Sequence, residues 1–403
     1  MGLRAIGVAS ASCSLVIAAW AWAGPPGKTS SPGVETVAIA ERVVGDVARV
    51  QTGEIVFISG NDLALVEELG LAVQRRGGLP LELFARTERA RRYFDEVPAK
   101  FDRARGDLWL KLAELPQVTI EVGGGDAPEV WRGVPPDRLT TVNQSYARGN
   151  ARLLKRNVRQ VELGNGLFPS DANARRLGLT RQELENVFRA GVATDPEKLA
   201  AAGERVRELV TVGTELRVTA PNGTDLRMRV DGRKVLVSDG VISPEEAKQG
   251  GAAAMVWLPA GEAYVSPVPG TATGRVVWDR IDFRGNVVEG LTALFTNGKV
   301  TSLMARPSPT FDEWRATFDK SPPCRDSLAV VDIGLNADVK PRSGKPLLNW
   351  VPQGMVSVFF GGDLWAGGSN DCPFGGGGFL PDATVTIDGK PLVEKGVLVQ
   401  PGS

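Results

Sequence analysis

The chain has 403 residues, of which 42% are apolar and 23% charged, as expected for a globular protein large enough for two domains. Lysine plus arginine and aspartate plus glutamate both number 47, so no net positive charge indicates a nucleic-acid partner. The sequence contains no histidine, which excludes Ser-His-Asp and Cys-His catalysis and any metal site that depends on imidazole.

The N-terminus has the layout of a secretory signal peptide. A basic head at Met1–Arg4 precedes a small-residue and apolar run to Trp20, and Ala21-Trp22-Ala23 forms an A-x-A cleavage pattern. The run is short for a membrane span, although an uncleaved anchor is an alternative. We therefore expect residues 1–23 to export the protein to the periplasm or the extracellular space, with no membrane contact after cleavage. Residues 24–35, rich in Pro, Gly and Ser, are expected to be a flexible linker.

The cysteines fit an exported protein. Removal of the leader also removes Cys13 and leaves Cys324 and Cys372. A pair of cysteines in an oxidising compartment predicts a disulfide, and two buried free thiols are the alternative.

Residues 36–212 alternate between helical and strand patterns, which predicts an α/β domain with a parallel sheet. Asp195 followed by Pro196 is a typical helix start. Helices are predicted at 37–50, 62–76, 87–94, 108–115, 143–156, 180–190 and 195–210, and strands at 54–59, 79–84, 118–122 and 158–163.

Residues 213–403 predict a second, mostly β (α+β) domain with few helices. Short β-type runs are separated by Gly, Asn-Gly and Asp-Gly turns. Trp257, Trp278 and Trp314 are expected to be core or interface residues. The clearest strands are predicted at 215–219, 226–230, 275–278, 287–295, 384–387 and 397–400.

Two C-terminal segments carry a family resemblance. Residues 258–267 (LPAGEAYVSP), together with 347–361 (LLNWVPQGMVSVFFG) and GGSN at 367–370, resemble motifs of the thermophilic metalloaminopeptidase family, which includes aminopeptidases T and S. The resemblance implies an aminopeptidase T-type fold with the active site in the C-terminal domain, and a homodimer. It also implies two divalent ions, Zn²⁺ or Co²⁺, that activate a water to attack the N-terminal peptide bond of a peptide.

Of the five metal ligands that the resemblance implies, few remain. The first glutamate corresponds to Glu262. The second corresponds to Asp332, which is one methylene shorter, or to Val330 in a strict register, which loses the ligand. The first histidine corresponds to Ser357, whose neutral hydroxyl is a poor ligand for Zn²⁺ or Co²⁺. Glu262 and Asp332 alone could hold only a weakly bound hard cation.

The remaining ligand positions of the family are also occupied by other residues in this sequence. The last histidine and the aspartate correspond to Gly375 and Gly377, and an acidic pair upstream of the first histidine corresponds to Asn349 and Trp350. The run 361–378 is interpreted either as a remodelled pocket wall or as a Gly-rich connection closed by the disulfide. On the first interpretation the pocket residues are Ser357, Asn349, Trp350, Trp365, Asn370, Gly375 and Gly377.

Two hypotheses follow for function. The first is an exported aminopeptidase-like hydrolase with altered or weak metal dependence, using Glu262 and Asp332. The second is a non-catalytic protein that binds a peptide or other small ligand in the remodelled cleft.

Overall fold

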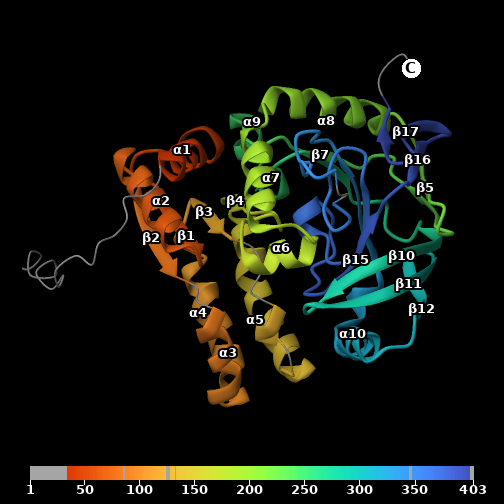
Figure 1. The fold of residues 1–403 in the computed structure, drawn as a ribbon, viewed down its shortest axis with the longest axis horizontal. Coiled ribbons are helices and arrows are strands. Elements are labelled where there is room, and N and C mark those ends of the chain that lie inside the picture. Colours follow the sequence, from red (N-terminus) through yellow and green to blue (C-terminus); the bar gives the residue numbers. More distant parts are fainter. Residues whose placement is uncertain (1–33, 85–86, 124–127, 132, 345–346, 400–403) are drawn as a thin grey trace, which may run out of the picture.

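Three β-sheets organise the chain in the computed structural model, which describes residues 34–84, 87–123, 128–131, 133–344 and 347–399 (Figure 1). The predicted signal peptide and most of the predicted linker lie outside the described residues. Among those that are described, no helix is long and apolar enough to cross a bilayer.

The first sheet is parallel throughout, as the alternating pattern predicts. Its strand order is β2-β1-β3-β4-β8. The four strands predicted in the N-terminal half are all present, whereas β8 comes from the other half of the chain and was not predicted. The strands are β1 (Ile55–Gly60), β2 (Leu79–Phe84), β3 (Val118–Val122), β4 (Arg159–Leu163) and β8 (Met255–Leu258).

Helices cover both faces of this sheet. Val56 and Ile58 of β1 pack in the main core with apolar residues of α1 and α2, while Phe57 points to the opposite face and contacts Trp109 of α4. The helices are α1 (Val34–Arg42, continued by η1, Val43–Val47), α2 (Leu63–Arg75), α3 (Thr87–Glu96), α4 (Asp102–Leu112), α5 (Pro136–Lys155), α6 (Asp171–Leu177), α7 (Arg181–Ala193) and α8 (Pro196–Thr211), with 3₁₀ turns η2 (Ala99–Phe101) and η3 (Pro128–Trp131).

Side-chain caps explain where several helices begin. Asp62 accepts a hydrogen bond from the Leu65 N–H, and Asp195 accepts one from the Glu197 N–H, so both predicted starts are confirmed. The helices predicted at 108–115 and 143–156 begin earlier, at Asp102 and Pro136, because polar first turns hide the apolar period. Helix α6 was not predicted.

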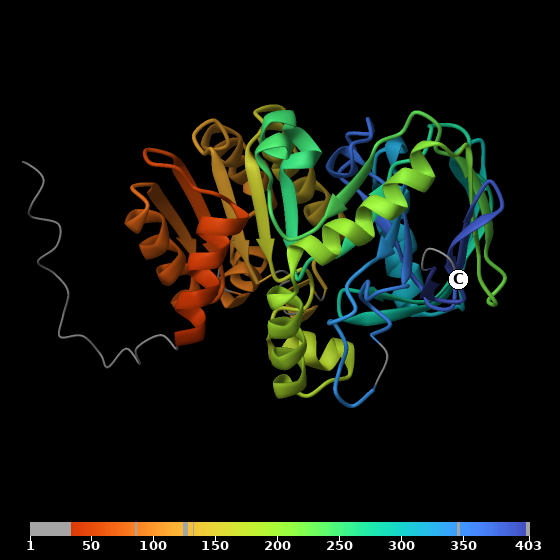
Figure 2. The same cartoon turned by 90° about the horizontal axis from the view of Figure 1, so that it is seen from above.

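The C-terminal half forms two antiparallel sheets, as expected for a β-rich region. The larger has the order β12-β11-β10-β6-β5-β16-β17-β18 and curls at the end of the molecule away from the parallel sheet, while α8 lies between the two halves (Figure 2). Its strands are β5 (Glu215–Thr219), β6 (Asp225–Arg229), β10 (Thr273–Phe283), β11 (Asn286–Thr296), β12 (Lys299–Met304), β16 (Thr384–Ile387), β17 (Lys390–Glu394) and β18 (Val397–Leu398).

The second antiparallel sheet, which we call the central sheet, has the order β15-β14-β13-β9-β7. Its strands are β7 (Val235–Ser238), β9 (Glu262–Val265), β13 (Leu328–Gly334), β14 (Val356–Gly361) and β15 (Gly375–Leu380). The remaining elements are α9 (Pro244–Gln249), α10 (Pro309–Lys320), η4 (Gly251–Ala254), η5 (Pro323–Asp326) and η6 (Leu364–Ala366). Because β8 from residues 255–258 completes the parallel sheet, the two predicted domains share that sheet; the boundary at 212/213 remains a prediction.

Candidate ligand-binding cleft

The polar residues of the site follow the carboxyl ends of neighbouring strands. Asn165 comes just after β4, and Glu262 begins β9 after the turn that follows β8. Strands β4 and β8 pair in parallel, so both residues emerge at the same edge of the sheet, where ligands of open α/β sheets bind. The Asn165 Nδ2 donates hydrogen bonds to Glu262 Oε1 (2.9 Å) and to the Pro259 carbonyl (3.0 Å).

A glycine turn sets the position of Glu262. Gly261 has a φ of +122°, and a Cβ there would lie 2.5 Å from the Asn336 Cβ, so only glycine fits. Asn336 is fully buried, and its Nδ2 donates a 2.6 Å hydrogen bond to the Ala260 carbonyl. The predicted Pro-x-Gly-Glu motif is therefore a rigid turn that directs Glu262 toward the parallel sheet.

The central sheet places Asp332 and Ser357 in one row. Asp332 lies opposite Tyr264 on β9 and opposite Ser357 on β14. The Ser357 hydroxyl donates to Asp332 Oδ2 at 3.1 Å. Ser357 is completely buried, so it supports Asp332 from the neighbouring strand and does not line the cleft.

These elements enclose a cavity of about 560 Å³, which we call the candidate cleft. Five aromatic side chains form part of its walls, and two of its carboxyl groups are those expected from the sequence. The lining residues are Asn165, Gly166, Arg176, Met255, Trp257, Glu262, Arg280, Ile281, Asp282, Asp332, Asn349, Trp350, Val351, Phe359, Trp365, Gly377, Gly378 and Phe379.

Burial raises the pKa of both carboxyl groups. It raises the pKa of Glu262 to about 7, against the opposing effect of the Asn165 hydrogen bond. Burial and the nearby Glu262 carboxylate raise the pKa of Asp332 well above its usual range, which favours its protonated form. Asp332 is only 6% exposed, and its Oδ1 has no hydrogen-bond partner among the described residues.

A third carboxyl group, Glu162 on β4, lies close to this pair. Burial, together with the carboxylates of Glu121 and Glu262, raises its pKa to about 7. Neither Glu162 nor Asn165 was predicted from the sequence. A signal existed, because both lie at or just beyond the carboxyl end of a predicted strand.

An arginine supplies positive charge at the other side of the candidate cleft. Arg176 on α6 donates hydrogen bonds to the Gly166 and Asn349 carbonyls, and no carboxylate of the described residues lies within ion-pair distance of it. Arg280, by contrast, pairs with Asp282 at 3.0 Å. Burial lowers the pKa of Arg176, and the nearby Asp282 carboxylate opposes this effect.

The structure brings most of the predicted pocket residues together. Asn349, whose Nδ2 donates to Asp282 Oδ2 (2.8 Å), lines the candidate cleft with Trp350, Trp365 and Gly377. Trp350 is anchored by a 2.7 Å hydrogen bond from its Nε1 to the Asn165 carbonyl. One expectation needs correction: Trp257 lines the cleft, because β8 carries it to the sheet edge, whereas Trp278 and Trp314 are buried in the core.

Besides Ser357, two more predicted residues lie outside the lining, Asn370 and Gly375. Asn370 organises the loop before β15, since its Nδ2 donates to the carbonyls of Cys324 (2.9 Å) and Gly361 (2.7 Å). Gly375 is exposed. The predicted disulfide is present between Cys324 and Cys372, with Cα atoms 5.7 Å apart, so the run 361–378 is both a disulfide-closed connection and, through Trp365 and Gly377, part of the wall.

The donors present do not fit a pair of zinc or cobalt ions. No three His, Cys, Asp or Glu side chains of the described residues gather in a way that could hold a metal ion. At Gly377, where the resemblance places an aspartate, φ is +140° and a Cβ would lie 2.3 Å from the Val358 carbonyl oxygen. The Ser357 hydroxyl is directed to Asp332. The present backbone therefore excludes one expected ligand sterically, and we derive no step through a metal.

Comparisons with known proteins bear on the fold. No protein-family model matches the sequence, and no curated protein matches it. Among solved structures, AmpT from Thermus thermophilus superposes with a TM-score of 0.64 at 18% identity, covering 91% of this chain and 99% of the other. This chain has the aminopeptidase T fold. A 2,5-dihydroxypyridine dioxygenase from Pseudomonas putida KT2440 also superposes, with a TM-score of 0.56 at 13% identity over 91% of this chain and 97% of the other.

The aminopeptidase T fold thus accounts for both halves of the chain, including the parallel sheet and the β-rich region. A likeness at 18% identity establishes architecture and not chemistry. What this chain does has to be argued from the residues of the candidate cleft.

Proposed function

We propose that this protein is an exported small-ligand-binding protein on an aminopeptidase T scaffold, without metal-dependent peptidase activity. The observation that carries the proposal is Asp332, a buried carboxyl that lines the candidate cleft and whose Oδ1 has no hydrogen-bond partner among the described residues. An unpaired buried polar atom costs about 1–3 kcal/mol, and a ligand acceptor can recover that free energy.

The ligand class follows from the walls and the charge. Trp257, Trp350 and Trp365 offer flat apolar surfaces, which suit a ring. Arg176 is a desolvated cation without an ion-pair partner among the described residues, so an anionic group on the ligand is favoured. We infer a small planar carboxylate; the dioxygenase of the same fold is itself named for a small aromatic substrate.

Binding is tested by tryptophan fluorescence, because three tryptophans line the candidate cleft. Titration with benzoate is expected to change the emission at saturable concentrations, and benzamide, which lacks the charge, is expected to bind about tenfold more weakly. Arg176→Gln should remove the preference for benzoate, while Arg175→Gln on the same helix serves as the control. Equal responses to both compounds in the native protein would contradict the proposed class.

Catalysis is tested separately on the purified mature protein. We expect no stoichiometric metal and no release of an aminoacyl fluorophore with added Co²⁺, Zn²⁺ or Mn²⁺. Bound metal together with turnover that Glu262→Gln abolishes would instead establish the hydrolase hypothesis.

Export and assembly are further parts of the proposal. The Cys324–Cys372 disulfide supports an oxidising compartment. Mass spectrometry of the exported protein should give an N-terminus at Gly24, and light scattering should show whether the homodimer implied by the family resemblance forms.

A further inference from the structure

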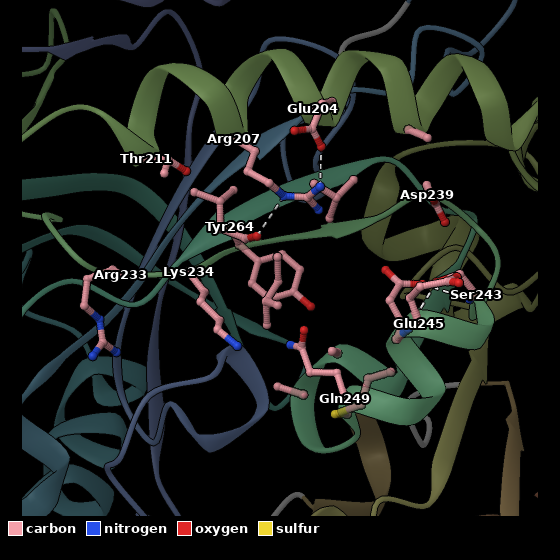
Figure 3. Close-up of a pocket in the computed structure, with 18 of the residues that line it drawn as sticks. Glu204, Arg207, Thr211, Arg233, Lys234, Asp239, Ser243, Glu245, Gln249 and Tyr264 are labelled. Atoms are coloured by element: carbon pink, nitrogen blue, oxygen red, sulfur yellow. Dashed lines mark hydrogen bonds and ion pairs between the residues drawn. The ribbon is translucent and has the colours of Figure 1, made fainter.

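A second and larger cavity, which we call the charged cavity, lies beside the candidate cleft between α8, β7 and α9. Its volume is about 900 Å³, within the range of pockets that hold drug-sized ligands. Met255 lines both cavities. Figure 3 shows Tyr264 near the middle of the charged cavity, with charged side chains around it.

Among the described residues, the hydroxyl of Tyr264 has no hydrogen-bond partner. Tyr264 is only 2% exposed, and its ring centroid lies 5.6 Å from those of both Trp257 and Trp365, so the ring is fixed. No hydrogen bond from its hydroxyl exists among the described residues, although the residue lines the charged cavity. Burial raises the pKa of Tyr264, so the hydroxyl keeps its proton and can donate it to a ligand acceptor.

The charges around Tyr264 are separated by sign. In Figure 3, Arg233 and Lys234 lie on one side of Tyr264, and Asp239 and Glu245 lie on the other. Within the described part of the chain, neither Lys234 nor Glu245 has a hydrogen-bond or ion-pair partner, and both line the cavity. The cavity therefore offers a free cation at one end and a free anion at the other.

Small side chains line part of the remaining wall, which also includes the Glu204–Arg207 ion pair on α8. Ala200 and Ala201 of α8 and Ala252 and Ala253 of η4 leave room between the charged ends. A ligand that matches all three features has a negative end, a positive end and a hydrogen-bond acceptor between them. A short peptide with free termini has this chemistry.

We propose that the charged cavity binds a short peptide through both termini. The peptide carboxylate lies at Lys234, the ammonium group lies at Glu245, and a peptide carbonyl accepts a hydrogen bond from the Tyr264 hydroxyl. This site is distinct from the candidate cleft, and the inference does not depend on which ligand that cleft binds.

The test is calorimetric titration of the mature protein with trialanine. Trialanine with free ends is expected to bind, and its N-acetyl and its C-terminal amide forms are expected to bind about tenfold more weakly, since each loses one charge-assisted contact. Tyr264→Phe, which removes only the hydroxyl, should also weaken binding.

Variants locate each end of the peptide. Lys234→Gln should bind free and amidated trialanine equally, and Glu245→Gln should bind free and acetylated trialanine equally. The controls Lys248→Gln on α9 and Glu208→Gln on α8 change exposed charges outside the cavity and should keep the native preferences. Equal binding of the free and capped peptides to the native protein would overturn the proposal, as would preferences that survive Lys234→Gln and Glu245→Gln.

Discussion

The two faces of the central sheet are built from the same strands and have opposite characters. On one face Val265, Val331, Val358 and Phe360 join the main apolar core. On the other face lie the residues of the candidate cleft, among them Asp332. Successive residues of a strand point to opposite faces, so each strand contributes to both. The apolar face is covered by other apolar side chains of the core, whereas the cleft face leaves the Asp332 Oδ1 without a partner among the described residues, and there we place the proposed ligand.

The largest expected effect contrasts two adjacent phenylalanines. Phe360 is fully buried, with its ring centroid 6.0 Å from that of Trp278, whereas Phe359 lines the candidate cleft. Phe360→Ala should lower the free energy of unfolding by about 3–5 kcal/mol because it leaves a cavity. Phe359→Ala should cost clearly less, since its ring already borders open space. Urea unfolding measures both, and equal losses would contradict the difference between the faces.

The second effect concerns the disulfide that closes the loop over the cleft face. Cys324 and Cys372 are 48 residues apart in the sequence, so their link restricts the unfolded chain. Replacing both by serine should lower the free energy of unfolding by about 2–4 kcal/mol. The emission of Trp365 in that loop should change while the far-ultraviolet circular dichroism stays constant.

Reduction provides the control for this prediction. Dithiothreitol should destabilise the native protein by the same amount and leave the double variant unaffected. Titration of the denatured mature protein should find no free thiol, and two free thiols would contradict the pairing.

A smaller effect is a pH dependence of the stability that comes from Asp239, which lines the charged cavity. Burial and the nearby Glu246 together raise the pKa of Asp239 from 3.8 to about 6. The Val241 N–H and Arg207 oppose this shift. A raised carboxyl pKa means that the folded state loses stability as the pH rises from the unfolded value to about 6. Asp239→Asn should therefore match the native protein near pH 3.8 and be more stable than it above pH 6.

Asp231→Asn is the matched control, because the Arg229 hydrogen bond lowers the pKa of Asp231. Its effect should have the opposite sign, with a loss of stability at neutral pH. Thermal unfolding across this range measures both variants, and a gain for Asp239→Asn that is independent of pH would contradict the role of burial.

The smallest effect tests the support of Asp332. Ser357→Ala removes the hydroxyl that donates to Asp332 Oδ2 and should cost about 1 kcal/mol, the net value of one hydrogen bond. Its neighbour Val358 is fully buried on the apolar face, and Val358→Ala should cost more, since it leaves a cavity. A larger loss for Ser357→Ala would show that the polar row stabilises the sheet more than its apolar packing does.

Local sequence patterns determined much of the fold. Strands β1 to β4 and helices α2, α7 and α8 follow from apolar periodicity and caps, which act over a few neighbouring residues. The Pro-x-Gly-Glu turn and the cysteine pair were likewise visible in the sequence, and the missing histidines already argued against the metal chemistry of the resembling family. Helix α6 and the first turns of α4 and α5 were not predicted, because their polar residues obscure the helical spacing of apolar residues.

Only the tertiary structure decided how the site is assembled. Pairing of β8 with β4 brings residues 255–258 to the parallel sheet and places Trp257 and Glu262 beside Asn165 and Glu162. The orphaned oxygen of Asp332, the steric exclusion at Gly377 and the separated charges around Tyr264 are equally invisible in the sequence. The physical reason is the sequence distance over which each property is set. Periodicity and capping depend on residues close in the chain, whereas burial, pKa and cavity shape depend on contacts between residues far apart in the sequence.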